Sequence, residues 1–277
     1  MTRIAICAPA TPITRDVAER VVALAAAEFP DLELAFHEQC FVEEGHFAGS
    51  DAVRLAAFLE CANDPGSAAV WFARGGYGSN RVAQDALAHL SAAARGKAYV
   101  GYSDCGFVLA SLYRNKIGKP AHGPMPVDIR REGGEEAVRR TLAWLSGESS
   151  GLEPSLDGDP AVAFNLMILS SIAGTSLMPD LAGHVVMVEE IAEHLYAVDR
   201  LLFHVTNCLA GCGIAGLRLG RVINVPDNDR PFGSEPEAMA RYWCERNEIP
   251  FLGVAEIGHY SANRIVPFGV APVTGRS

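Results

Sequence analysis

The sequence has no long hydrophobic run. Nowhere does it approach the roughly 20 consecutive apolar residues that a membrane-spanning helix needs. The opening run from Ile4 to Ala8 is also shorter than the apolar core of a secretory signal peptide. We therefore expect a cytoplasmic protein that has no membrane as a partner.

Positive charge is scarce as well. The 277 residues include 23 Lys and Arg against 33 Asp and Glu, which gives a formal net charge of −10. Surfaces that bind nucleic acid or an anionic membrane depend on Lys and Arg to neutralise phosphates. The composition therefore argues against nucleic acid as a partner and favours a small or peptidic substrate.

Metal-ligating residues are present, but without the spacing of a metal site. Cys208 and Cys212 have no second pair with which to complete a zinc site. The segment from Glu190 to His194 lacks the first histidine of a metalloprotease helix. The seven cysteines, mostly within apolar runs, are typical of buried free thiols in a reducing compartment. We expect no metal ion.

A nicotinamide cofactor is not expected either. The segment Gly211-Cys-Gly213-Ile-Ala-Gly216 matches the glycine spacing of a dinucleotide-binding turn. The residues that follow, Leu217 to Val225, are typical of a strand, whereas that turn must open a helix. We therefore reject a nicotinamide site at this segment.

The first half of the chain alternates between strand-like and helix-like segments. This alternation predicts an α/β fold with a parallel sheet covered by helices on both faces, whose ligands bind at the carboxyl ends of the strands. The predicted strands span residues 3–8, 32–37, 68–73 and 98–102, and the predicted helices span 15–28, 51–61, 80–90 and 135–145.

A polar segment rich in glycine and proline, residues 147–160, is the predicted linker. It divides the chain into an N-terminal domain of residues 1–150 and a C-terminal domain of residues 151–277. The second half is less regular, with predicted strands at 185–188, 217–225 and 251–257 and predicted helices at 196–207 and 235–247.

Ser103 lies at the turn between the predicted strand 98–102 and a helix whose apolar residues begin at Phe107. A serine in such a turn can present its hydroxyl above the sheet edge, where N–H groups at the helix start stabilise negative charge. The alternative is a helix N-cap, with Asp104 placed to suit the helix dipole. Cys105, on the first helical turn, is expected to be buried.

A second special turn, Arg74-Gly-Gly-Tyr-Gly78, follows the predicted strand 68–73. Glycines permit positive φ and let a ligand approach the backbone closely. Two interpretations stay open: a tight connection between strand and helix, or a set of backbone N–H donors beside Ser103.

A serine nucleophile needs a base within hydrogen-bond reach and usually a carboxylate that orients the base. His122 and His259 each follow an expected element and are the two candidate bases. The candidate carboxylates are Glu189, Glu190 and Glu193, which come after an apolar run. For each residue an ordinary structural role stays open, as a hydrogen-bonded histidine or a solvated acid.

Taken in order, these segments resemble the LD-carboxypeptidase family of serine peptidases over nearly the whole chain. The family pairs a Rossmann-like N-terminal domain with a smaller, β-rich α/β C-terminal domain, so the resemblance implies that fold here. The resemblance is carried by Ala8-Pro-Ala10, Trp71-Phe-Ala-Arg-Gly-Gly-Tyr-Gly78, Gly101-Tyr-Ser-Asp104, His122-Gly-Pro-Met125, Asn165-Leu166, Ala173-Gly-Thr175, Val188-Glu-Glu190, Tyr196, Asp199-Arg200, Gly258-His259, Asn263 and Pro267-Phe-Gly269.

The resemblance implies a catalytic triad. Ser103 is implied as the nucleophile, His259 as the general base and Glu189 as the carboxylate that orients His259. The serine and its base would then lie on different domains and meet across the cleft between them.

The resemblance also implies an oxyanion hole and a substrate site. The oxyanion hole would combine the backbone N–H of Asp104 with one from Gly75 or Gly76. Arg74 is our hypothesis for the partner of a substrate carboxylate, because it neighbours that turn. The residues expected to bind substrate are Arg74, Tyr77 and His122.

The implied activity is hydrolysis of the bond between an L-centre and a terminal D-amino acid, as in murein tetrapeptides during cell-wall recycling. One alternative in the same family is a self-immunity amidase of the microcin C7 type, acting on a peptidyl or aminoacyl nucleotide. An alternative of another class is a peptide-binding module that keeps the cleft without catalysis. The resemblance implies a homodimer and no metal or organic cofactor.

Overall fold

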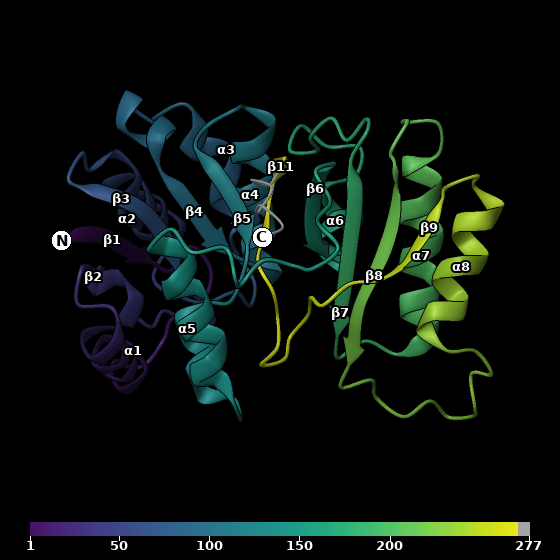
Figure 1. Cartoon of the computed structure of the whole chain (residues 1–277), viewed down its shortest axis with the longest axis horizontal. Coiled ribbons are helices and arrows are strands. Elements are labelled where there is room, and N and C mark those ends of the chain that lie inside the picture. Colours follow the sequence, from purple (N-terminus) through teal and green to yellow (C-terminus); the bar gives the residue numbers. More distant parts are fainter. Residues whose placement is uncertain (271–277) are drawn as a thin grey trace.

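Two sheets, each built mainly of parallel strands, stand side by side in the computed structural model, which describes residues 1–270 (Figure 1). The strand order is β10-β5-β4-β3-β1-β2 in the first sheet and β11-β6-β7-β8-β9 in the second. All pairs are parallel except β10 on β5 and β11 on β6. The predicted α/β class is confirmed. Residues 271–277 of the expected C-terminal domain lie outside the described residues.

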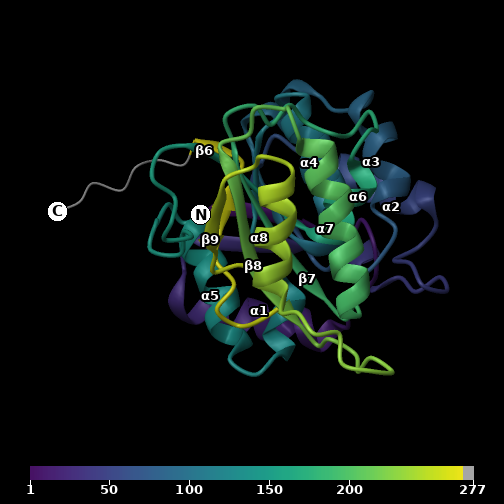
Figure 2. The same cartoon turned by 90° about the vertical axis from the view of Figure 1, so that its right-hand side faces the viewer.

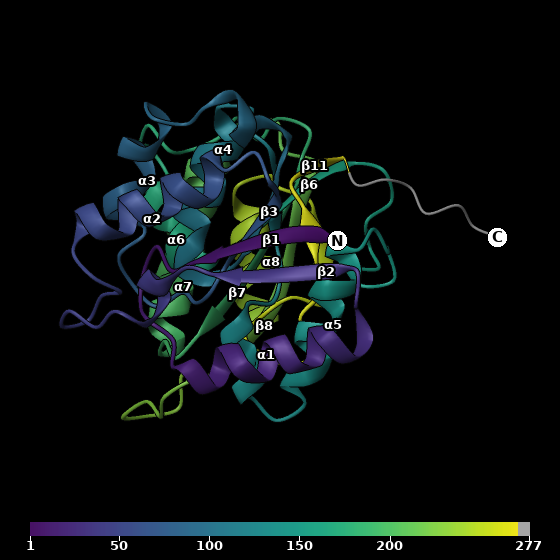
Figure 3. The same cartoon turned by 90° about the vertical axis from the view of Figure 1, so that its left-hand side faces the viewer.

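The first sheet is covered by helices on both faces, as the alternation predicts (Figure 3). Ile4 and Ile6 of β1 pack toward α1 and α5, whereas Ala5 and Cys7 pack toward α2, α3 and α4. The elements are β1 (Thr2–Cys7), α1 (Arg15–Glu28), β2 (Leu32–Phe36), α2 (Asp51–Asn63), β3 (Ser67–Phe72), α3 (Asn80–Leu87), β4 (Ala98–Gly101), α4 (Gly106–Arg114), β5 (Lys119–His122) and α5 (Gly134–Leu145).

The second sheet carries its helices on one face (Figure 2). Its other face packs against chain without helices, where Leu156, Ile257 and Val266 contact apolar strand residues. The elements are β6 (Pro160–Asn165), α6 (Leu166–Ile172), β7 (Val185–Ile191), α7 (Leu195–Leu209), β8 (Gly216–Ile223), α8 (Pro236–Arg246) and β9 (Phe251–Val254).

One hydrophobic cluster continues from the first sheet into the second. It includes Phe107 of α4 together with Phe164 of β6 and Ile168 of α6. Gly106 opens α4, and a Cβ there would lie 3.0 Å from Cγ2 of Ile168. The missing side chain therefore lets the two helices approach closely, and the two sheets share a core at this seam.

The predicted linker is held in place by hydrogen bonds. The N–H of Glu153 donates to the carbonyl of Ile265 at 3.0 Å, and the N–H of Ile265 donates to the carbonyl of Gly151 at 3.0 Å. The carboxylate of Glu153 accepts from the N–H of Glu256 at 3.1 Å. The boundary between the two domains stays a prediction.

The chain returns to the first sheet after it has crossed the second. β10 (Val266–Pro267) pairs with β5, and β11 (Gly269–Val270) pairs with β6. His122 of β5 is buried, and its Nε2 donates to Oδ1 of Asn263 at 3.1 Å. Burial lowers the pKa of His122 to about 4, so this histidine is neutral at pH 7.

The cysteines follow the sequence expectation only in part. Five of the seven are buried free thiols, but Cys208 and Cys212 are exposed. The prediction of burial is wrong for these two. The buried face of α7 is formed by residues such as Val205 and Leu209, so Cys208 falls on the solvent side of the helix.

Arg54 of α2 is a fully buried guanidinium that joins three loops. It donates to the carbonyls of Pro9 at 2.6 Å and Gly78 at 2.7 Å. It also donates to the carbonyl of Gly49 at 3.2 Å, and it pairs with Asp51. Since Pro9 follows β1 and Gly78 follows β3, Arg54 fixes the loops at the carboxyl edge of the first sheet.

We expect the substitution Arg54→Met to lower the free energy of unfolding by about 3 kcal/mol or more, because each buried carbonyl that loses its donor costs about 1–3 kcal/mol. Urea unfolding followed by circular dichroism measures the change. Arg81→Met is the matched control, because Arg81 pairs with Asp51 at 2.7 Å but is exposed. The free energy of unfolding should fall by less than about 1 kcal/mol in Arg81→Met. An equal fall in the two variants would contradict the role of Arg54.

We also expect His122 to destabilise the fold in acid. The pKa is 6.5 for an ordinary histidine and about 4 here, so the unfolded chain binds more protons between these values and stability falls as pH falls through them. The contribution is on the order of 3 kcal/mol at most, at about 1.4 kcal/mol for each unit of pKa.

The measurement is urea unfolding at pH 7 and near pH 4.5, for the natural chain and for His122→Gln. Glutamine can still donate to Asn263 but does not titrate. The variant should lose less stability between the two pH values. An unchanged pH dependence would rule out His122 as a source of acid sensitivity.

Candidate active site

Ser103 follows β4 after one residue, Tyr102, and begins a single 3-10 turn, Ser103–Cys105. Its φ of +57° is left-handed, which costs a residue other than glycine about 1–3 kcal/mol. The helix-cap interpretation does not hold, since α4 begins at Gly106 and Cys105 occupies the cap position. Ser103 instead lines a cavity of about 320 Å³.

Asp104 turns its carboxylate away from this cavity, against the end of the Arg74–Gly78 turn. The carboxylate accepts from the N–H groups of Gly78 at 3.3 Å and Ser79 at 2.8 Å. Burial raises the pKa of Asp104. Cys105 is buried as expected. The side chain of Asp104 therefore fixes the turn, and only its backbone is available to the site.

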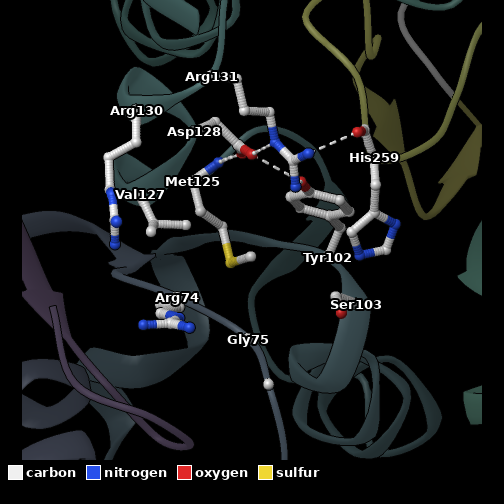
Figure 4. A pocket seen from close by; sticks show the side chains of 11 residues that line it. Arg74, Gly75, Tyr102, Ser103, Met125, Val127, Asp128, Arg130, Arg131 and His259 are labelled. Carbon is white, nitrogen blue, oxygen red and sulfur yellow. Dashed lines mark hydrogen bonds and ion pairs between the residues drawn. The ribbon is translucent and has the colours of Figure 1, made fainter. Parts of the chain in front are cut away.

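The second half of the chain contributes a buried pair, His259 and Glu189. Nδ1 of His259 lies 2.7 Å from Oε2 of Glu189, and the side chains are 8% and 0% exposed. Because the carboxylate accepts, Nδ1 carries the proton and Nε2 is left as an acceptor. Figure 4 shows one ring nitrogen of His259 facing Ser103.

Two glycines make this pairing possible. Gly220 of β8 lies against Glu189 of β7, where a Cβ would come within 3.0 Å of the glutamate Cβ and 2.6 Å of Cγ1 of Ile257. Gly258 has a φ of +143°, which turns the chain from Ile257 into His259. The loop after β9 can therefore lie directly on β7.

Residues of the first half hold His259 from the other side. The rings of Tyr102 and His259 lie 4.7 Å apart. Oδ1 of Asp128 accepts from the Tyr102 hydroxyl at 2.7 Å and from Nε of Arg131 at 2.8 Å. Nη1 of Arg131 donates to the carbonyl of His259 at 2.7 Å (Figure 4).

Sequence reasoning did not find Asp128 or Arg131. Their one signal is that they closely follow the His122-Gly-Pro-Met125 segment. Both lie in or next to a 3-10 turn, Pro126–Arg130, in which the N–H of Met125 donates to Asp128 at 2.8 Å. This turn forms one wall of the cavity.

Gly75 and Gly76 form another part of the wall. A Cβ on Gly75 would lie 3.1 Å from Oγ of Ser103 and 3.3 Å from the backbone nitrogen of Asp104. The carbonyl of Gly75 accepts from Oγ1 of Thr11 at 2.6 Å. The C=O of Gly75 and the N–H of Gly76 belong to the same planar trans peptide and point in opposite directions, so this N–H points away from Thr11. Thr11, which follows the Ala8-Pro-Ala10 segment, was not identified from the sequence.

The predicted substrate-binding residues occupy three different places. Arg74 lines the catalytic cavity. Tyr77 is exposed and lines a second cavity of about 570 Å³, which meets the first at Gly76. His122 is buried with its ring 5.4 Å from that of Tyr102, and it is not part of the wall of the catalytic cavity.

Of the three candidate carboxylates, Glu189 contacts a histidine base. Glu190 instead accepts from Nδ2 of Asn165 at 2.7 Å and from the N–H of Met167 at 2.9 Å, at the start of α6. Burial raises the pKa of Glu190. Glu193 lines neither of the two cavities.

Within residues 1–270, no three His, Cys, Asp or Glu side chains are placed to hold a metal ion. No helix in the same part of the chain combines the length and apolar character needed to cross a bilayer.

Comparisons with known proteins agree with this architecture. The family description "LD-carboxypeptidase N-terminal domain" matches residues 4–123, and "LD-carboxypeptidase C-terminal domain" matches residues 160–272. The murein tetrapeptide carboxypeptidase of Pseudomonas aeruginosa is 26% identical, over 98% of this chain and 92% of that protein.

Solved structures extend the comparison to the fold. The muramoyltetrapeptide carboxypeptidase from Oxalobacter formigenes has a TM-score of 0.79 at 25% identity, covering 97% of this chain and 93% of that one. MccF in complex with glutamyl sulfamoyl guanosine also has a TM-score of 0.79, at 16% identity over 97% and 91% of the chains, which is a likeness of fold alone. The chain belongs to the LD-carboxypeptidase family and is a serine-type carboxypeptidase, a hydrolase.

Proposed function

We propose that this protein hydrolyses an L,D-peptide bond and releases the terminal D-amino acid of a murein tetrapeptide, with Ser103, His259 and Glu189 as its triad. The observation that carries the proposal is the buried 2.7 Å hydrogen bond between His259 and Glu189, with the other edge of the imidazole facing Ser103 (Figure 4). A nucleophile, a base and a group that orients the base are the parts that acyl transfer needs.

In the proposed reaction, Ser103, His259 and Glu189 each have a distinct role. Nε2 of His259 takes the proton of the Ser103 hydroxyl as Oγ attacks the scissile carbonyl. Glu189 keeps its hydrogen bond to Nδ1 and stabilises the imidazolium that forms. His259 then gives the proton to the leaving amine, and water hydrolyses the acyl-enzyme through the same base.

The oxyanion would be bound by two backbone N–H groups, those of Asp104 and Gly76. The Asp104 nitrogen lies against the Gly75 backbone, and the Thr11 hydroxyl turns the Gly76 N–H away from itself. Donors fixed before the reaction need no reorganisation as charge develops, and each is worth about 10²–10³-fold in rate. Gly75 contributes its carbonyl and its lack of a side chain.

The substrate class rests on the carboxypeptidase family and on the relatives named for murein peptides. Arg74 would bind the free carboxylate that an exopeptidase substrate presents. Tyr77 would contact the acyl part of the peptide, and His122 would act through Tyr102 and Asn263 instead of touching substrate. Cell-wall recycling and a homodimer are parts of the proposal that rest on the family resemblance, and a cytoplasmic location is a part that rests on the short apolar runs of the sequence.

The direct test is a mass-spectrometric assay with murein tetrapeptide. The natural chain should release one D-alanine, and Ser103→Ala should lower the turnover number by roughly 10⁶-fold, as when other serine nucleophiles are removed. Turnover by Ser103→Ala at the natural rate would exclude Ser103 as the nucleophile.

The same assay separates the alternative functions. Turnover of an aminoacyl-sulfamoyl nucleoside but not of tetrapeptide would replace the murein substrate by the amidase alternative. Binding of tetrapeptide without turnover of either compound would favour a binding module.

Thr11 gives a second prediction about the oxyanion site. Thr11→Val keeps the shape but removes the hydroxyl that holds the Gly75 carbonyl, so we expect the turnover number to fall by about tenfold or more with little change in KM. Thr11→Ser keeps the hydroxyl and serves as the control. Equal activity of the valine and serine variants would show that this hydrogen bond does not position the donor.

A further inference from the structure

Two arginines in the wall of the catalytic cavity have no acidic partner. Arg74, Arg130 and Arg131 all line this cavity. Arg131 pairs with Asp128, but neither Arg74 nor Arg130 forms an ion pair with any residue in the range 1–270. Arg74 donates to the neutral carbonyl of Pro12 at 3.2 Å. The cavity that contains the nucleophile therefore also contains two positive charges without an acidic partner.

The two charges act on each other. Figure 4 shows Arg130 reaching toward Arg74 on one side of the cavity, with Ser103 and His259 on the opposite side. Burial, and next the positive charge of Arg130, hold the pKa of Arg74 below its usual value. Two cations that approach each other with reduced solvation form a favourable site for an anion.

We propose that Arg74 and Arg130 together bind the free carboxylate of the leaving amino acid, so that Arg130 determines whether the enzyme accepts only a chain terminus. This inference rests on the proposed function and extends it to the leaving-group side of the site. Guanidinium groups suit the role, because their planar donors match a carboxylate in two parallel hydrogen bonds.

The second cavity supports this assignment of sides. Its wall contains Asp104 and uncharged residues such as Asn80, Gln84 and Met167, but no Lys or Arg. The two cavities meet at Gly76, next to the nucleophile. The cationic cavity therefore suits the end of the substrate that carries the carboxylate, and the other cavity suits the acyl chain.

The backbone that carries Arg130 is fixed before substrate arrives. Arg130 ends the 3-10 turn Pro126–Arg130, in which Asp128 accepts from the N–H of Met125 at 2.8 Å. The neighbouring carbonyl of Ile129 accepts from Nη2 of Arg20 at 2.8 Å. Only the exposed Arg130 side chain must be ordered on binding, which reduces the entropic cost.

The test pairs a change in the enzyme with a change in the substrate. Hydrolysis is measured for a tetrapeptide ending in D-alanine and for the same peptide ending in D-alaninamide, with the natural chain and with Arg130→Gln. A lost charge-assisted hydrogen bond predicts that Arg130→Gln lowers kcat/KM for the acid by roughly 10- to 100-fold. For the amide, the variant and the natural chain should be equal.

The matched control is Arg139→Gln. Arg139 lies on α5 and pairs with Glu28 and Glu136, and it lines neither cavity. This variant should match the natural chain on both peptides. An equal loss on the acid and the amide in Arg130→Gln, or no loss on the acid, would overturn the proposal.

Binding separates this inference from the reaction itself. Calorimetry compares the binding of N-acetyl-D-alanine with that of N-acetyl-D-alaninamide. The two proteins are the Ser103→Ala variant and the double variant that also carries Arg130→Gln. The acid alone should bind, and the second substitution should weaken it by roughly 10-fold or more. If the acid and the amide bind alike, or if neither binds, the arginine pair is not a carboxylate site, whatever the outcome of the tetrapeptide assay.

Discussion

The hydrogen bond between His259 and Glu189 is the constraint on which the rest of the structure depends. Both residues belong to the second sheet and its loops, whereas Ser103 lies in the turn that follows β4 of the first sheet. His259 is buried and oriented by the second half of the chain, so it can act as a base for Ser103 only if the first half is held against it. Much of the fold maintains that alignment: a hydrophobic cluster that spans both sheets, Gly106 where α4 meets Ile168 of α6, and a C-terminal segment that pairs with both sheets.

The carboxyl edge of the first sheet is fixed in a similar way, by buried polar groups that bind backbone. Arg54 binds the carbonyls of Pro9 and Gly78, and the hydroxyl of Thr11 binds the carbonyl of Gly75. The Asp104 carboxylate binds the N–H groups of Gly78 and Ser79. Each bond is modest by itself, but each leaves an unpaired buried group if it is lost. The strained φ of Ser103 is tolerated because its surroundings are fixed in this way.

The sequence predicted the first sheet well because its strands are apolar and regularly alternate with helices. It missed β5 and β6 for local reasons: β5 has four residues and contains Pro120, whereas β6 begins with Pro160 and leads into α6 without a turn. The lack of a turn sequence between β6 and α6 is also the reason that α6 was not predicted. The exposure of Cys208 on α7 and of Cys212 just after that helix was missed, because apolar neighbours in sequence do not show which side of an element is buried.

Prediction of the site was uneven for a physical reason. Ser103 could be located from its turn, since strand, serine and helix are adjacent in sequence. His259 and Glu189 were candidates among several, and the family resemblance selected them, because their contact joins residues 70 positions apart. Thr11, Asp128, Arg130 and Arg131 were not singled out, because their only local signal is that they follow the Ala8-Pro-Ala10 and His122-Gly-Pro-Met125 segments. The contacts of Thr11 with Gly75 and of Arg131 with His259 join segments far apart in sequence.

The measurement that tests the central claim most directly is the rate at which a serine-directed phosphonate labels the folded protein, with the adduct located by peptide mapping. If the second sheet activates Ser103 through His259, the adduct forms on Ser103, and Glu189→Gln slows its formation by roughly 10²-fold or more. Glu193→Gln, a nearby glutamate that lines neither cavity, should label like the natural chain. An adduct on another residue, or a labelling rate that does not depend on Glu189, would contradict the account.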